Sequence, residues 1–268
     1  MHCDDTAALR FLSFLFHDVS SNCQQSVPVT VLELMKTGQA ATYLLKENGE
    51  VRGSGCLGVG LAALLFDVVI TALLKNNAGG LALHAGAVAH GGETILLPGQ
   101  SGAGKSTLTA WMVAHGFSYL TDELVFFPSD PPGCMLPFTR PLCIKPGAVP
   151  VIKQWIQDTN LATLADDQGL IMPHRAVNAQ FIPHNTAPAL ILFPAFRNGS
   201  TCRLDRLSPA KTIALLMGCN VNGRNLAGHG FSEATRLAKS APAYRVVYGC
   251  CDDLTSVLSP LFPTLVEV

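Results

Sequence analysis

The stretch LALHAGAVAHGGETILLPGQSGAGKST, residues 81–107, joins two strand-like segments to a glycine-rich loop. Only Gly91 and Gly92 stand between the first segment, which ends at His90, and the second, which begins at Glu93. A loop of two residues can join only antiparallel neighbours, because parallel strands need a long crossover connection. The stretch therefore predicts an antiparallel hairpin whose second strand runs into the loop.

The loop itself, GQSGAGKS at residues 99–106, fits the phosphate-binding pattern G-x-x-x-x-G-K-[ST] in full. Its glycines let backbone N–H groups approach phosphate oxygens, and the helix expected over residues 105–115 adds a positive N-terminus. Lys105 is expected to reach the β- and γ-phosphates, and Ser106 to ligate Mg²⁺. The expected nucleotide-binding residues are Gly99, Ser101, Gly102, Ala103, Gly104, Lys105, Ser106 and Thr107.

The register of the hairpin brings a histidine to this P-loop. If His90 pairs with Glu93, counting back along both strands places His84 opposite Gly99, the first residue of the loop. The alternative is a structural histidine at a strand edge. The register favours a functional role for His84. The hairpin also predicts a mixed sheet, since the P-loop strand of the common P-loop hydrolases lies in a parallel set.

An acidic pair, Asp122 and Glu123, lies in a strand expected over residues 117–127, after the P-loop helix. Neighbouring residues of a strand point to opposite faces, so the two carboxylates share one site only if the strand bulges or ends there. One of them is expected to act on Mg²⁺ or on an attacking hydroxyl. The alternative is a solvated pair at a strand end.

Composition limits the classes of function. The formal net charge of -1 provides no basic field for nucleic acid, and 49% hydrophobic residues support a sizeable core. Nine cysteines without C-x-x-C spacing, and no basic secretory start, predict a reduced, cytoplasmic protein. The apolar run at residues 57–74 carries Asp67 and predicts a buried helix rather than stable membrane insertion.

Two regions are expected along the chain. Residues 1–56 predict a small β-rich subdomain, because residues 27–35 and 40–55 carry strand formers around the hairpin signal Asn48-Gly49. Residues 57–268 begin with the apolar helix and predict an α/β P-loop domain, with a loop over residues 158–170.

The block LHAGAVA…LLPGQSGAGKSTLTAWMVAHGFSYLTDEL, residues 83–124, resembles the HPr serine kinase/phosphorylase family. It resembles more closely the HPr-kinase-related proteins of bacterial peptide-modification gene clusters, some of which phosphorylate a serine of a lasso-peptide precursor. Weaker similarity continues through LPFTRPLCIK, LILFPAF and LDRLSPAKTIALLMGCNVN. The resemblance implies the mixed-sheet P-loop fold shared with phosphoenolpyruvate carboxykinases.

The resemblance also implies roles for individual residues. Asp122 corresponds to the catalytic carboxylate, the general base, and His84 to the active-site histidine. Glu123 corresponds to the second acidic residue, which we expect to bind the metal. The family's Glu-Ile-Arg-Gly signature is replaced by the stretch from Cys143 to Pro146, so neither the reverse phosphorylase reaction nor HPr itself is implied.

The expected function is an ATP-dependent, Mg²⁺-requiring kinase acting on a serine or threonine hydroxyl of a peptide or small protein. Two alternatives remain, a kinase for a small alcohol and a nucleotide-sensing module without transfer. The sequence leaves the oligomeric state open, a homo-oligomer included. Five cations are expected in loops, as phosphate or substrate ligands or as solvated charges: Arg140, Lys145, His174, Arg175 and Arg224.

Overall fold

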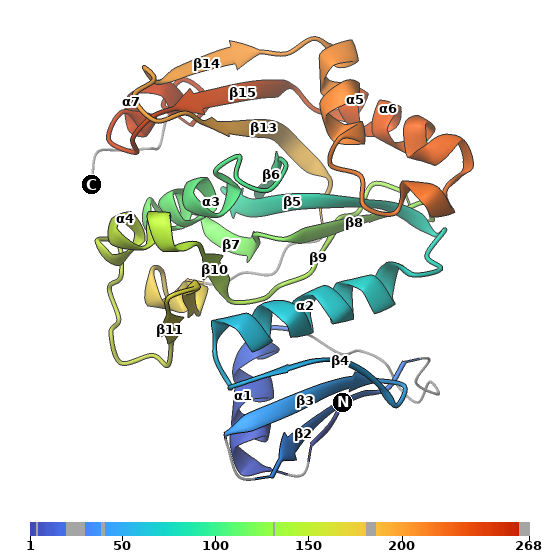
Figure 1. Ribbon diagram of the computed structural model, residues 1–268. Coiled ribbons are helices and arrows are strands. Elements are labelled where there is room, and N and C mark those ends of the chain that lie inside the picture. The colour runs from blue at the N-terminus through green and yellow to red at the C-terminus, as the bar shows by residue number, and fades with distance from the viewer. Residues whose placement is uncertain (4, 20–29, 39–40, 131, 181–185, 263–268) are drawn as a thin grey trace.

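The computed structural model describes residues 1–3, 5–19, 30–38, 41–130, 132–180 and 186–262 (Figure 1). Within these residues the strands form sheets of four, three and eight members, and helices pack against them. The chain is therefore a mixed α/β protein with mixed sheets, as the sequence predicts. The first residues of the strand expected over 27–35 lie outside the described part.

The N-terminal sheet follows the order β1-β2-β3-β4. Its elements are β1 (His2–Cys3), α1 (Thr6–Leu15), β2 (Leu32–Thr37), β3 (Thr42–Glu47) and β4 (Glu50–Gly55). The predicted hairpin at Asn48-Gly49 is present, with both residues at positive φ, as its tight turn requires. The sequence did not predict α1, which Asp5 caps and which buries Phe11 and Leu15.

The large sheet has the order β14-β15-β13-β6-β5-β8-β9, with β7 also on β5. Its strands are β5 (Gly80–His90), β6 (Glu93–Pro98), β7 (Ser118–Thr121), β8 (Leu124–Pro128), β9 (Leu136–Pro137), β13 (Pro188–Phe196), β14 (Arg203–Arg206) and β15 (Ala243–Tyr248). Alternate side chains serve two cores: Ile95 and Leu97 of β6 face one cluster, and Leu96 faces the other.

Helices cover both faces of this sheet (Figure 1). They are α3 (Lys105–Ala114), α4 (Val149–Lys153), α5 (Pro209–Met217), α6 (Phe231–Ser240) and α7 (Leu254–Leu258). The core with Ile95 and Leu97 includes Trp111 of α3 and Leu254 of α7, whereas the core with Leu96 includes Leu216 of α5 and Leu237 of α6. The P-loop strand is thus enclosed between two helical layers.

The predicted hairpin register is confirmed. Strands β5 and β6 are antiparallel, with His90 opposite Glu93 and Ala85 opposite Pro98. The N–H of Gly99 faces the carbonyl of His84 at an N···O distance of 3.4 Å. On its other side β6 pairs in parallel with β13, so the P-loop strand lies in a mixed sheet.

Helix α2 (Val59–Leu74) lies between the N-terminal sheet and the large sheet (Figure 1). Its buried residues, Leu65 and Phe66 among them, share one hydrophobic cluster with α1, β2 and β3. The division of the chain at residues 56 and 57 stays a prediction. Across the described residues, every helix is too short or too polar to traverse a lipid bilayer.

Two sequence expectations are corrected by the structure. The single strand expected over residues 117–127 is interrupted at Asp122 and Glu123, and a register shift lies just before the break. The loop expected over residues 158–170 instead contains a hairpin of β11 (Leu164–Asp166) and β12 (Gly169–Met172). Strand β12 also pairs with β10 (Leu142–Ile144), which gives the hairpin a neighbour that its polar sequence does not reveal.

The segment after α5 is fixed to the start of β5. The N–H of His84 donates to the carbonyl of Cys219, and the N–H of Val221 donates to that of Ala82. Asn222, 3% exposed, accepts from the N–H of Ala82 and donates to the carbonyls of Asn77 and Gly80. One buried amide therefore joins this segment both to β5 and to the end of α2.

We predict that Asn222→Ala lowers the free energy of unfolding by about 1–3 kcal/mol, because it leaves buried backbone groups without partners. Urea unfolding measures the change. Asn76→Ala is the matched control, since Asn76 is exposed and the described structure gives its side chain no hydrogen bond. Equal stability of the two variants would contradict the anchoring role.

Candidate active site

The P-loop is shaped to receive an anion. Gly102 and Gly104 have φ values of 85° and 96°, in the left-handed region that favours glycine. The hydroxyl of Tyr248 donates to the carbonyl of Gly104 over 2.8 Å, and a Cβ at Gly104 would collide with that hydroxyl. No side chain caps the N-terminus of α3, which leaves the first N–H groups of the helix available to phosphate.

His84 lies between the P-loop lysine and the acidic pair. Its Nε2 is 2.8 Å from Nζ of Lys105, and its Nδ1 is 2.9 Å from the carbonyl oxygen of Glu123 and 3.1 Å from Oε1 of the same residue. Since Nδ1 faces two acceptors and Nε2 faces an ammonium group, the geometry selects the neutral tautomer with hydrogen on Nδ1. The histidine expected at the loop is thus bonded to the lysine of that loop.

Both carboxylates of the acidic pair contact one guanidinium, that of Arg140. Nε of Arg140 lies 3.2 Å from Oδ1 of Asp122, and an Nη2 donor of Arg140 bonds Oε2 of Glu123. Arg140 is 6% exposed, so the expectation of a solvated loop charge is wrong for this residue. The interruption of the strand lets neighbouring carboxylates converge, which an unbroken strand would prevent.

The two carboxylates differ in access to solvent. The Asp122 side chain is 0% exposed and also receives hydrogen bonds from Tyr119 and from the N–H of Cys143. The Glu123 side chain is 27% exposed. Burial alone would raise the pKa of Glu123, but the His84 hydrogen bond and the Arg140 charge lower that pKa to about 2. Glu123 is therefore an accessible, firmly ionised oxygen ligand.

Lys105 is a largely buried cation, and its charge is stabilised by nearby anions. Burial lowers its pKa, and the charges of Glu123 and Asp122 oppose this shift. Its Nζ donates to the carbonyl of Gln100 over 3.1 Å, in addition to contacting His84. A phosphate group at the loop would restore the favourable environment that burial removes.

A cavity of about 1270 Å³ collects these groups. Its lining includes the predicted residues Ser101, Gly102, Gly104, Lys105, Ser106, Thr107, His84, Asp122 and Glu123. Gly99 and Ala103 do not line it; Gly99 faces β5, and the carbonyl of Ala103 accepts from the N–H of Phe196. Trp111 and Trp155 contribute aromatic surface to the same cavity.

The donor set at this cavity fits Mg²⁺. Mg²⁺ prefers oxygen ligands, and the hydroxyl of Ser106 and the carboxylate of Glu123 both line the cavity. Among the described residues, no group of three or more His, Cys, Asp or Glu side chains could hold a metal ion on its own.

The other four residues expected in loops, Lys145, His174, Arg175 and Arg224, lie in three different surroundings. Nζ of Lys145 lies 2.9 Å from Oγ of Ser101, at the P-loop. His174 is fully buried against Tyr119, and Arg175 forms an ion pair with Asp18, so both belong to the packing around β12. Arg224 is exposed and lines a second cavity.

The sequence leaves the role of Arg140 open and does not indicate Tyr119, whose single hydroxyl hydrogen is shared between the carbonyl of Arg140 at 2.8 Å and Oδ1 of Asp122 at 3.2 Å. The sequence does indicate that the acidic pair has a cationic partner such as Arg140, because two carboxylates buried beside apolar strand residues require a nearby positive charge. Tyr119 offered no such signal, since a tyrosine in a strand is most often a core residue.

Comparison with known proteins adds no relative: no protein-family model matches the chain, and no curated protein sequence matches it. The resemblance to HPr kinases therefore stays a prediction, and the candidate site rests on its geometry.

The depressed pKa of Glu123 predicts a loss of stability in acid. Its folded-state pKa of about 2 lies below the ordinary value of 4.5, so its contribution is full at neutral pH and is lost as pH falls from about 4.5 towards 2. The stability advantage of wild type over Glu123→Gln should shrink by on the order of 2 kcal/mol between about pH 6 and pH 3. Denaturant unfolding at each pH measures it. The exposed Glu50→Gln is the control, and a constant difference between wild type and Glu123→Gln would refute the linkage.

Proposed function

We propose that the protein is an ATP-dependent kinase that transfers the γ-phosphoryl group to a serine or threonine hydroxyl of a peptide or small protein. The observation that carries the proposal is the meeting of Lys105, His84 and the pair Asp122 and Glu123 at one P-loop cavity. A phosphate cradle serves many functions, but a carboxylate pair at its mouth suits proton removal from an acceptor. The resemblance to HPr kinases supports the same choice.

The proposed roles follow from charge and access. The backbone N–H groups of residues 101–107 hold the phosphates, and Lys105 neutralises the β- and γ-phosphates. Ser106 and Glu123 would hold Mg²⁺, which supplies further charge neutralisation at the transferred group when it is bound. His84 orients Glu123 and Lys105 through its two ring nitrogens.

Asp122 is the proposed general base. The acceptor oxygen attacks the γ-phosphorus, the bond from that phosphorus to the β,γ-bridging oxygen breaks, ADP leaves, and the hydroxyl proton passes to the Asp122 carboxylate. Positioned proton transfer of this kind contributes about 10²–10⁴ in rate. A specific observation favours the competing nucleotide-sensor function: Asp122 is fully buried and bonded to Arg140 and Tyr119.

We predict that Lys105→Ala weakens Mg-ATP binding by about tenfold or more, or abolishes transfer, because a charge-assisted phosphate contact is lost. Isothermal titration calorimetry measures the affinity, and a thermal melt verifies that the fold is retained. Lys211→Ala, at an exposed lysine of α5, is the control. Unchanged affinity together with unchanged turnover would remove the P-loop from the mechanism.

The two carboxylates should separate in single-turnover experiments at saturating Mg-ATP. We predict that Asp122→Asn binds Mg-ATP nearly normally but loses most transfer, because the amide keeps the shape and cannot accept a proton. Glu123→Gln should instead cost metal affinity, read from the Mg²⁺ dependence of the rate. Thermal melts of both variants show whether loss of the Arg140 contacts unfolds the protein.

The opposite result, an active Asp122→Asn enzyme and an inactive Glu123→Gln enzyme, would exchange the two roles. If both variants keep the wild-type rate, a carboxylate base is not part of the reaction. If wild type binds Mg-ATP tightly and forms no phosphorylated product with any acceptor, the sensor function replaces the kinase.

A further inference from the structure

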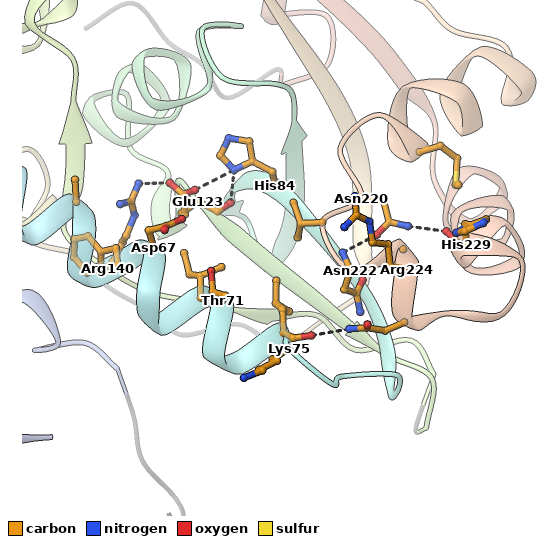
Figure 2. Close-up of a pocket in the computed structure, with 18 residues that line it drawn as sticks. Asp67, Thr71, Lys75, His84, Glu123, Arg140, Asn220, Asn222, Arg224 and His229 are labelled. Carbon is orange, nitrogen blue, oxygen red and sulfur yellow. Dashed lines mark hydrogen bonds and ion pairs between the residues drawn. The ribbon is translucent and has the colours of Figure 1, made fainter. Parts of the chain in front are cut away.

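A second cavity, of about 980 Å³, lies between α2 and the segment Met217–His229 (Figure 2). One wall is a stripe of α2 at Ala63, Asp67, Ile70 and Leu74, which recur on one helical face. The opposite wall is the segment that follows α5. We call this cavity the α2 cleft.

The two walls of the α2 cleft are bonded to each other. The side chain of Asn225 donates to the carbonyl of Leu74 over 2.7 Å, and that of Asn222 donates to the carbonyl of Asn77 over 3.0 Å. Within the segment, the side chain of Asn220 donates to the carbonyl of His229. The backbone of His229 has a positive φ of 56°. The cleft is therefore a preformed groove whose width these bonds set.

The α2 cleft and the P-loop cavity share a boundary. His84, Glu123 and Arg140 line both, and Figure 2 shows His84 and Glu123 directed towards one end of the cleft. Phosphoryl transfer needs the attacking and leaving oxygens roughly in line, so an acceptor must approach from the side away from ADP. With nucleotide phosphates at the P-loop, the α2 cleft offers such an approach to Glu123, behind which the buried Asp122 lines the P-loop cavity.

The length of the cleft suits a chain rather than a small alcohol. From Ala63 to Leu74 the helix rises about 16 Å, which matches about five residues of extended peptide. A volume near 980 Å³ is also at the upper end of sites that enclose a small molecule.

Charge in the α2 cleft is distributed unevenly. Lys75, Arg224 and His229 line it, all three are exposed, and the described structure gives their side chains no ion pair. Figure 2 shows Lys75 and Arg224 away from Glu123, whereas Asp67 lies near it. On a chain with a net charge of -1, Lys75 and Arg224 give this part of the groove a local positive charge.

We propose that the α2 cleft binds the acceptor as an extended peptide segment, with its serine or threonine hydroxyl at the Glu123 end. An aspartate or glutamate of the segment, three or four residues away, then meets Lys75 and Arg224. The spacing follows from the separation of eight positions between Asp67 and Lys75, a rise of about 12 Å along α2. The inference rests on the proposed kinase function, and its transfer step is the one described above.

The test is phosphate transfer from radiolabelled Mg-ATP by the full-length protein to synthetic peptides at low ionic strength. Each peptide has one serine in a neutral background, with one glutamate placed two to six residues away on either side. A matched peptide carries glutamine at the same position. We expect the glutamate peptides with a spacing of three or four residues to be preferred about three- to tenfold in kcat/KM, through KM.

Charge reversal assigns this preference to the cleft. In Arg224→Glu and Lys75→Glu the preference for glutamate should disappear, and a lysine peptide of the same spacing should become the better acceptor. Lys239→Glu, at an exposed position of α6 outside both cavities, should keep the wild-type preference. Calorimetry of Mg-ATP binding by each variant shows that the nucleotide cavity is intact.

The outcomes separate the inference from the proposed function. Equal transfer to glutamate and glutamine peptides, or a preference unchanged in Arg224→Glu, would overturn the acceptor site while the kinase stands. Transfer to glycerol or free serine but to no peptide would overturn the acceptor site and the peptide acceptor of the proposed function, and would leave a kinase for small alcohols. Tight Mg-ATP binding without transfer to any acceptor would overturn both.

Discussion

A guanidinium with almost no solvent contact constrains the structure around it. Arg140 is 6% exposed, and an unpaired charge at that depth would cost several kcal/mol, so carboxylates must accompany it. Both come from the dipeptide Asp122-Glu123, and they converge because the strand on β5 is interrupted there. Arg140 also lies over the Phe66 ring, at 4.9 Å from its centroid, and thereby connects the acidic pair to α2.

From this ion pair a continuous series of contacts runs to the P-loop. Arg140 bonds Glu123, Glu123 accepts from His84, and Nε2 of His84 accepts from Lys105. The P-loop cavity and the α2 cleft are therefore separated by side chains that are bonded to one another.

Local rules were sufficient for the P-loop hairpin. The two-residue loop Gly91-Gly92 permits only an antiparallel connection. Counting paired positions back from that loop places His84 opposite Gly99, and the structure has the same register. Those rules failed at Asp122 and Glu123, because side-chain alternation assumes an unbroken strand, and the break is stabilised by Arg140 from a distant segment. The α2 cleft was equally beyond prediction. Its walls lie more than a hundred residues apart in the chain, and Asn222 and Asn225 resemble ordinary loop residues until their partners are known.

A catalytic base must be basic as well as reachable, and the two carboxylates of the acidic pair differ in access to solvent. Glu123 is the more accessible, yet its pKa of about 2 makes it a poor proton acceptor near neutral pH, since transfer is most efficient when the pKa lies near the working pH. The same low pKa keeps Glu123 ionised beside a cation, which is the property that a Mg²⁺ ligand needs. In the proposed kinase the proton passes to Asp122, whose side chain is fully buried, so the acceptor must reach it past Glu123. Glu123 and Arg140 line the α2 cleft, whereas Asp122 lines the P-loop cavity, so an acceptor in the cleft meets the Glu123–Arg140 contact first. If Glu123 is the metal ligand and Asp122 the base, as we propose, an acceptor that enters along α2 meets the metal ligand first and the base behind it.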